Sequence, residues 1–180
     1  MLNKLINENL TILGQGIEVL GHTPPSVYTA DNAETFGSSC GAHFRHLIQH
    51  YQAFFSGVET GLIDYDHRDR TVDLESDRNA AVQALAELRE AFAARHLREQ
   101  PIQILQNYDP KKPRQPVASG ISRELTFLVS HSIHHYALIG VILRLNGILV
   151  PQQFGFAPST IFYLKGLAEE QATTTLVHAS

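Results

Sequence analysis

Six of the ten histidines in this 180-residue chain lie in two short stretches about eighty residues apart. The first stretch contains His43, His46 and His50, and the second contains His131, His134 and His135. On helices, the spacings i, i+3, i+7 and i, i+4 place such rings along one face. Two helices of this kind packed face to face would bring three imidazoles around one point. Three imidazoles with an open position are typical of a metal site.

The residues that we expect to bind a metal are His46, His131 and His135. His131 and His135 have the spacing with which two imidazoles on one helix chelate a cation, as in the H-E-x-x-H helix of zinc proteases. Ser132 stands where that motif has its catalytic Glu, so the general base of a metalloprotease is missing and a peptidase is disfavoured. Apolar neighbours would make buried imidazoles costly, and a bound metal removes that cost.

Other polar residues lie close to these candidates. Three histidines could donate to carboxylates around the site, act as acid or base near a metal-bound water, or simply be packed: His43, His50 and His134. A direct ligand role is a further alternative for His43 or His50. The charged run 64–70 is most simply a solvated connection, from which Tyr65, Asp66 and Arg68 could reach the pocket. The pair Arg123-Glu124 is interpreted as a surface or helix-terminal charge arrangement.

The composition is that of an ordinary soluble globular protein, with 43% apolar and 18% charged residues. A net charge of −4 gives no general attraction to phosphate backbones or anionic membranes, which argues against a nucleic-acid binder. No apolar run approaches the roughly 20 residues that span a bilayer, and polar residues interrupt the N-terminus, which disfavours a secretory signal. Cys40 is the only cysteine, so no intrachain disulfide can form, and packing is a commoner role for it than metal ligation. We expect a cytoplasmic protein.

Apolar periodicity predicts the helices that must position the two stretches. Four principal helices are expected over about 2–21, over 38–57, from 76–77 onward, and over 123–146. The proline-containing stretch 101–118 predicts a short β-hairpin or an extended excursion between the third and fourth helices. We therefore expect one all-α domain over 1–180, an antiparallel four-helix bundle with a crossover. Its core would cover about 1–146 and its C-terminal extension 147–180.

These motifs resemble those of the DinB/YfiT-like superfamily. The resemblance rests on His43-x-x-His46 in the second helix and on His131-x-x-x-His135 in the last long helix, and it covers most of residues 1–146. It implies a four-helix bundle that binds a divalent metal at one end, with His46 as first ligand and His131 and His135 as the pair. The family includes thiol S-transferases that use bacterial low-molecular-weight thiols, and members without known activity.

The function expected from these observations is that of a metal-dependent enzyme of transferase or hydrolase type, acting on an unknown small molecule. A divalent ion (Zn, Ni or Fe, with Cu also compatible with imidazole) would lower the pKa of bound water or thiol. The main alternative is a non-catalytic bundle whose metal is structural or sensory, or whose histidines bind nothing. Haem or another cofactor between the helices is a third interpretation.

The helix expected over 2–21 and the segment from Phe154 to Leu164 carry more apolar residues than a small bundle easily buries alone. They predict a homodimer, since two-fold dimers are the commonest assembly. The alternative is that this segment folds back over the metal pocket as a lid.

Overall fold

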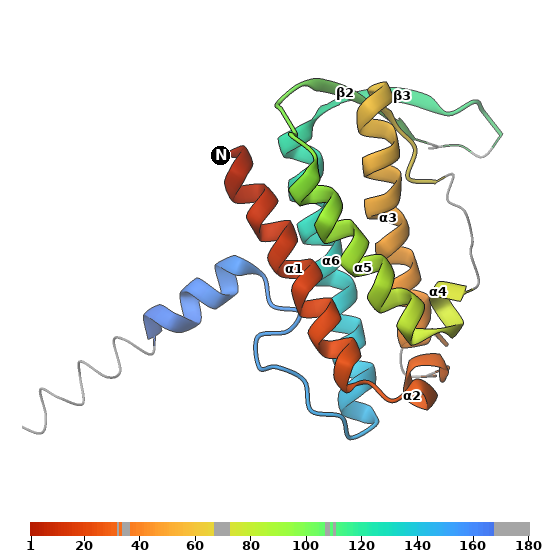
Figure 1. The fold of residues 1–180 in the computed structure, drawn as a ribbon, viewed down its shortest axis with the longest axis vertical. Helices are drawn as coiled ribbons and strands as arrows, with labels where there is room; N and C mark the ends of the chain where they lie inside the picture. Colours follow the sequence, from red (N-terminus) through yellow and green to blue (C-terminus); the bar gives the residue numbers. More distant parts are fainter. Residues whose placement is uncertain (32, 34–36, 67–72, 107–108, 110, 168–180) are drawn as a thin grey trace, which may run out of the picture.

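The computed structural model describes residues 1–31, 33, 37–66, 73–106, 109 and 111–167. Its body consists of four long helices (Figure 1): α1 (Leu2–His22), α3 (Cys40–Thr60), α5 (Arg78–Ala94) and α6 (Ile121–Leu145). Helices α1 and α3 each contact both α5 and α6, so the four surround a common core. Two short helices, α2 (Pro25–Thr29) and α4 (Asp73–Ser76), pack against α3.

Both ends of α3, the helix that carries the first histidine stretch, are explained by local chemistry. The Ser39 hydroxyl accepts a hydrogen bond from the Ala42 N–H at 3.0 Å, which satisfies one of the unpaired donors of the first turn. At the other end Gly61 has φ 77°, a left-handed conformation that favours glycine and stops the helix. The chain then enters a strand, which anchors the end of α3.

A three-stranded mixed sheet crosses one end of the long helices (Figure 1). The strands β1 (Leu62–Ile63), β2 (Pro101–Gln106) and β3 (Gln115–Gly120) lie in the order β1-β2-β3. Strand β2 pairs in parallel with β1 and antiparallel with β3. Ile102 and Ile104 of β2 point into the core, whereas the residues of β3 are mostly exposed.

The prediction of an all-α DinB-like four-helix bundle is therefore wrong, because this sheet is part of the fold. The stretch expected to be a short β-hairpin or an extended excursion is the hairpin β2-β3, and its first strand gains a parallel partner, not expected from the sequence, directly after α3. That partner, β1, contains two residues, Leu62 and Ile63. Two residues are too few to show the alternation by which a strand is recognised in a sequence.

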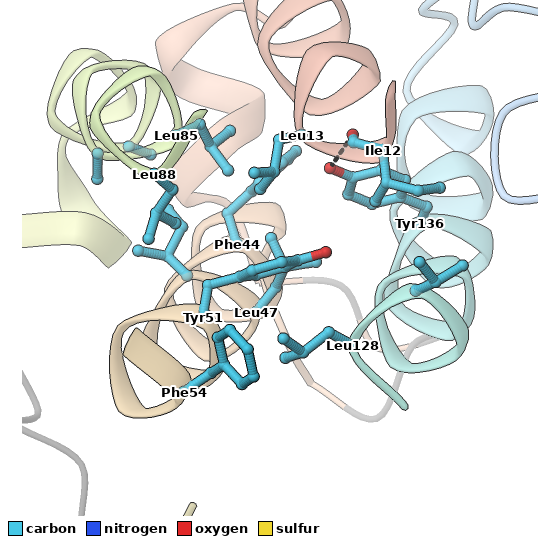
Figure 2. Packing of buried hydrophobic residues seen from close by; sticks show 14 of the residues in the cluster. Ile12, Leu13, Phe44, Leu47, Tyr51, Phe54, Leu85, Leu88, Leu128 and Tyr136 are labelled. Carbon is cyan, nitrogen blue, oxygen red and sulfur yellow. Dashed lines mark hydrogen bonds between the residues drawn. The ribbon is translucent and has the colours of Figure 1, made fainter. Parts of the chain in front are cut away.

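The core lies between the long helices, and Figure 2 shows its main side chains. Labelled there are Ile12 and Leu13 from α1, Phe44, Leu47, Tyr51 and Phe54 from α3, Leu85 and Leu88 from α5, and Leu128 and Tyr136 from α6. Buried hydrogen bonds tie α6 to its neighbours. The Tyr136 hydroxyl donates to the Ile12 carbonyl at 2.9 Å, drawn as a dashed line in Figure 2, and the Asn9 amide donates to the Leu125 carbonyl at 3.1 Å. These bonds set the register of α1 against α6.

Among the described residues, α6 is the helix that is long and apolar enough, by length and composition, to cross a membrane. Half of its most apolar window is buried inside the structure, where it packs against α1 and α3. The core helix of a soluble protein passes the same test, so length and composition alone do not distinguish the two cases.

The C-terminal extension runs back from the end of α6 toward α1 (Figure 1). Phe154 is buried, and its ring stacks on Tyr136 with a centroid distance of 4.6 Å. A helix over 158–167 follows and is mostly exposed, and the remaining residues 168–180 lie outside the described part of the chain. Together with α1, this extension lines a groove of about 520 Å³.

Candidate metal centre

Helices α3 and α6 pack against each other and bring the two histidine stretches together. The three residues expected as ligands are mutual neighbours. The ring centroid of His46 lies 5.1 Å from that of His131 and 4.7 Å from that of His135, and the latter two are 4.6 Å apart. The structure thus places His46, His131 and His135 in one cluster. That they bind a metal stays a prediction.

His50 also belongs to this cluster. Its ring centroid lies 4.4 Å from that of His46 and 4.3 Å from that of His131. One ring nitrogen from each of these three residues lies within 4.8 Å of the other two. Nitrogens bound to one tetrahedral ion at about 2.1 Å lie roughly 3.4 Å apart, so small side-chain rotations would complete the site. The sequence favoured a flanking role for His50 and left a ligand role open, although His46 and His50 have the same i, i+4 spacing as His131 and His135.

A backbone contact orients the His50 ring. Its Nδ1 lies 2.8 Å from the carbonyl oxygen of His46. A carbonyl oxygen can only accept, so Nδ1 carries the proton. In the neutral ring, Nε2 then has the lone pair that a metal requires. Histidine ligands in metal sites are commonly oriented by such a bond from the second ring nitrogen.

His43 and His135 form a second contact at the edge of the cluster. Their Nδ1 atoms are 3.0 Å apart, and both side chains are buried. Burial, with a smaller contribution from His134, lowers the pKa of His43 below its usual value. Burial and the neighbouring histidines, His131 first among them, lower the pKa of His135 to about 3. Both rings are therefore neutral at pH 7.

Three of the other candidates, His134, Asp66 and Cys40, lie outside the group formed by His46, His50, His131 and His135. His134 is exposed, with its ring centroid 5.2 Å from that of His135. Asp66 is exposed in a turn in which its N–H donates to the Asp64 carboxylate at 3.1 Å, and Arg68 lies outside the described residues. Cys40 is buried in the core, and burial raises the pKa of its thiol to about 12, which favours packing over ligation as a thiolate.

Two aromatic rings cover one side of the cluster. Tyr65 stacks on His50 at a centroid distance of 5.4 Å and an interplanar angle of 17°. Phe127 stacks on His131 at 5.3 Å and 23°, and the Tyr65 and Phe127 rings lie 5.2 Å apart. Tyr65 thus reaches the pocket, whereas the role of Phe127 was not anticipated from the sequence.

The Tyr65 hydroxyl contacts the carboxylate of Glu124, a residue that the sequence suggested to be at the surface. Glu124 is fully buried, although the sequence suggested a surface charge arrangement, and only its neighbour Arg123 is exposed. The Glu124 carboxylate accepts hydrogen bonds from the hydroxyls of Tyr65 at 2.9 Å and Ser119 at 2.5 Å, and from the Arg123 guanidinium at 2.8 Å. Burial, followed by the charge of Glu124, raises the pKa of Tyr65 well above its usual value, so Tyr65 stays a neutral donor. The apolar pattern of α6 gives no sign that Glu124 is buried. Its burial comes from the sheet, where Ser119 of β3 donates to its carboxylate.

Comparison with known proteins gives one informative similarity. No family model matches the chain, and no solved structure matches it. FK506-binding protein 5 from Rhizopus delemar is 33% identical to this chain over 161 residues, which are 87% of the chain and 40% of that protein. The chain therefore spans less than half the length of the curated relative that it matches.

This similarity overturns the expectation of a DinB-like metal-dependent enzyme, since the relative is named for FK506 binding rather than for transferase or hydrolase chemistry. The DinB interpretation depended on two short motifs, His43-x-x-His46 and His131-x-x-x-His135. Histidines three or four positions apart lie on one face of any helix, so unrelated helical proteins can contain both motifs. The spacing therefore defines a cluster of rings without defining a family.

Proposed function

We propose that the imidazole cluster binds one divalent transition-metal ion, with His46, His50 and His131 as its ligands. The observation that carries this proposal is the convergence of one nitrogen from each ring to within 4.8 Å, from two helices that pack against each other. Neutral imidazoles suit Zn, Ni, Fe and Cu, whereas Mg and Ca prefer oxygen ligands.

The choice of the third ligand is supported by the second nitrogen of each ring. The Nδ1 of His50 is held by a backbone carbonyl, which leaves the ring oriented toward His46 and His131. The Nδ1 of His135 faces the Nδ1 of His43, and either atom can be the donor, so the His135 Nε2 has a free lone pair only when His135 is the ring that donates. His135 remains the alternative third ligand, since its ring centroid is only 4.6 Å from that of His131.

The test is metal binding by untagged protein that has never contacted a nickel column. Elemental analysis after purification, followed by titration of the chelator-treated protein with Zn²⁺ or Co²⁺, should give one ion per chain. His50→Ala should weaken binding more than His135→Ala, and His96→Ala, in an exposed position after α5, should leave it unchanged. Failure of the wild-type protein to bind either ion at micromolar concentrations would refute the proposal.

The similarity favours a second candidate function, binding of FK506, the compound in the relative's name. The groove between α1 and 158–167 has a volume of about 520 Å³, within the range of small-molecule sites, and Ile12 and Val129 form part of its apolar lining. Isothermal titration with FK506 tests this candidate directly. Saturable binding that is weakened by Ile161→Asn, at a half-buried position in the lining of the groove, would support it, and absence of heat at micromolar protein would refute it.

A further inference from the structure

A single side chain, that of Tyr65, connects the buried carboxylate of Glu124 to the imidazole cluster. The carboxylate accepts from two neutral hydroxyls, those of Tyr65 and Ser119, and from one cation, Arg123. The Arg123 side chain is 62% exposed, so water screens much of its charge. A carboxylate removed from water is costly unless its charge is compensated. Three hydrogen bonds compensate this carboxylate, and a cation bound nearby would be attracted to its charge.

Tyr65 connects this carboxylate to the cluster. Its hydroxyl donates to Glu124 at 2.9 Å, and its ring lies flat on His50 with a centroid distance of 5.4 Å. The hydrogen bond fixes the position of the Tyr65 ring, and the stacked ring limits rotation of the His50 imidazole. Because the His50 Nδ1 is also held by the backbone, the ring is restrained from two sides.

From this arrangement we propose that Glu124 and Tyr65 are positioning residues of the metal site. Tyr65 holds the His50 ring in the orientation that ligates the ion, Glu124 holds Tyr65, and the charge of Glu124 offsets part of the charge of the ion. The inference depends on the proposed metal binding. Groups that orient a metal ligand in this way typically contribute about 10–100-fold to metal affinity.

Tyr65→Phe is the central variant, because it keeps the stacked ring and removes only the hydroxyl. We expect it to weaken Co²⁺ binding by about tenfold and to change the visible absorption of the bound Co²⁺, which reports ligand geometry. Glu124→Gln should weaken binding to a similar extent, since it keeps the shape and removes the charge. Ser119→Ala is the matched control, as it removes a donor to the same carboxylate from strand β3 rather than from the ring stacked on His50.

A double-mutant cycle separates positioning from general loss of stability. If Tyr65 acts through His50, Tyr65→Phe should have no further effect on Co²⁺ affinity in the His50→Ala background. An equal loss in both backgrounds, or an equal loss in Ser119→Ala, would overturn the inference. Wild-type binding together with unchanged affinity and spectrum in Tyr65→Phe would overturn it while leaving the metal proposal intact. Absence of binding by the wild-type protein would refute both.

Discussion

The Nδ1 atoms of His43 and His135 meet at 3.0 Å across the interface between α3 and α6. One of the two rings must donate to the other, and both are neutral, because burial lowers the pKa of each. The contact links the first turn of α3 to the middle of α6, next to the rings proposed as metal ligands. Protonation of either buried ring would place an uncompensated charge in this interface.

The first prediction is that the metal-free protein loses stability as the pH falls from 7.5 to 5.5. The pKa of His135 is about 3 in the folded protein and near 6.5 when unfolded, so only the unfolded chain gains a proton in this range. Urea unfolding in the presence of EDTA measures the effect. His135→Gln should reduce the slope of unfolding free energy against pH. A slope that is unchanged by this substitution would show that His135 is not the group responsible.

The second prediction is that Zn²⁺ stabilises the folded protein. At a free concentration one hundred times the Kd, binding adds about 2.7 kcal/mol to the free energy of unfolding. For a chain of this size that raises the Tm by roughly 5–10 °C. The shift should disappear with EDTA and in His46→Ala and His131→Ala, and it should shrink below about pH 6.5 as protons compete for imidazole. An equal shift in His131→Ala would place the bound ion elsewhere.

The helices could largely be predicted from the sequence because their determinants are local. The helix expected over 2–21 is α1 (Leu2–His22), and the one expected over 123–146 is α6 (Ile121–Leu145). Ser39, at the start of the helix expected over 38–57, caps α3. Strand β1 could not be predicted, since its two residues become a strand only by pairing with Gln103 and Ile104, about forty positions later.

In the candidate site too, one part could be predicted from local sequence patterns and another part could not. The histidine spacing was sufficient to bring His46, His131 and His135 together, because each helix presents its stripe on one face. The Tyr65–Glu124 bond joins residues separated by 59 positions, and it exists because the sheet end of the molecule covers Glu124. No periodicity within a single helix encodes such a contact.

The third prediction concerns the close contact between α3 and α4. A Cβ atom at Gly41 would lie 2.0 Å from the carbonyl oxygen of Glu75, a backbone atom that cannot move without displacing α4. Gly41→Ala should therefore destabilise the protein by about 1–3 kcal/mol, the usual cost of overpacking. Gly21→Ala in α1, which has open space around it, is the control and should be neutral or stabilising by up to about 1 kcal/mol. Urea unfolding of both variants checks the difference, and equal stabilities would contradict the packing argument.

The fourth prediction is that two copies of the chain associate through the helix over 158–167. Phe162 and Tyr163 are 69% and 66% exposed, which is costly for large aromatic side chains in a monomer. The alternative role as a lid over the metal pocket is less well supported, because the groove that this segment lines includes none of the clustered histidines among the described residues.

Light scattering at micromolar concentration should give a mass of twice 20.0 kDa for the wild-type chain. Phe162→Asp should convert the dimer to monomer, since it places a charge in the apolar contact. Val117→Asp, an exposed apolar position on β3 in the sheet, is the matched control and should leave the mass unchanged. A wild-type mass of 20.0 kDa would refute the dimer, and dissociation by Val117→Asp instead would move the interface to the sheet.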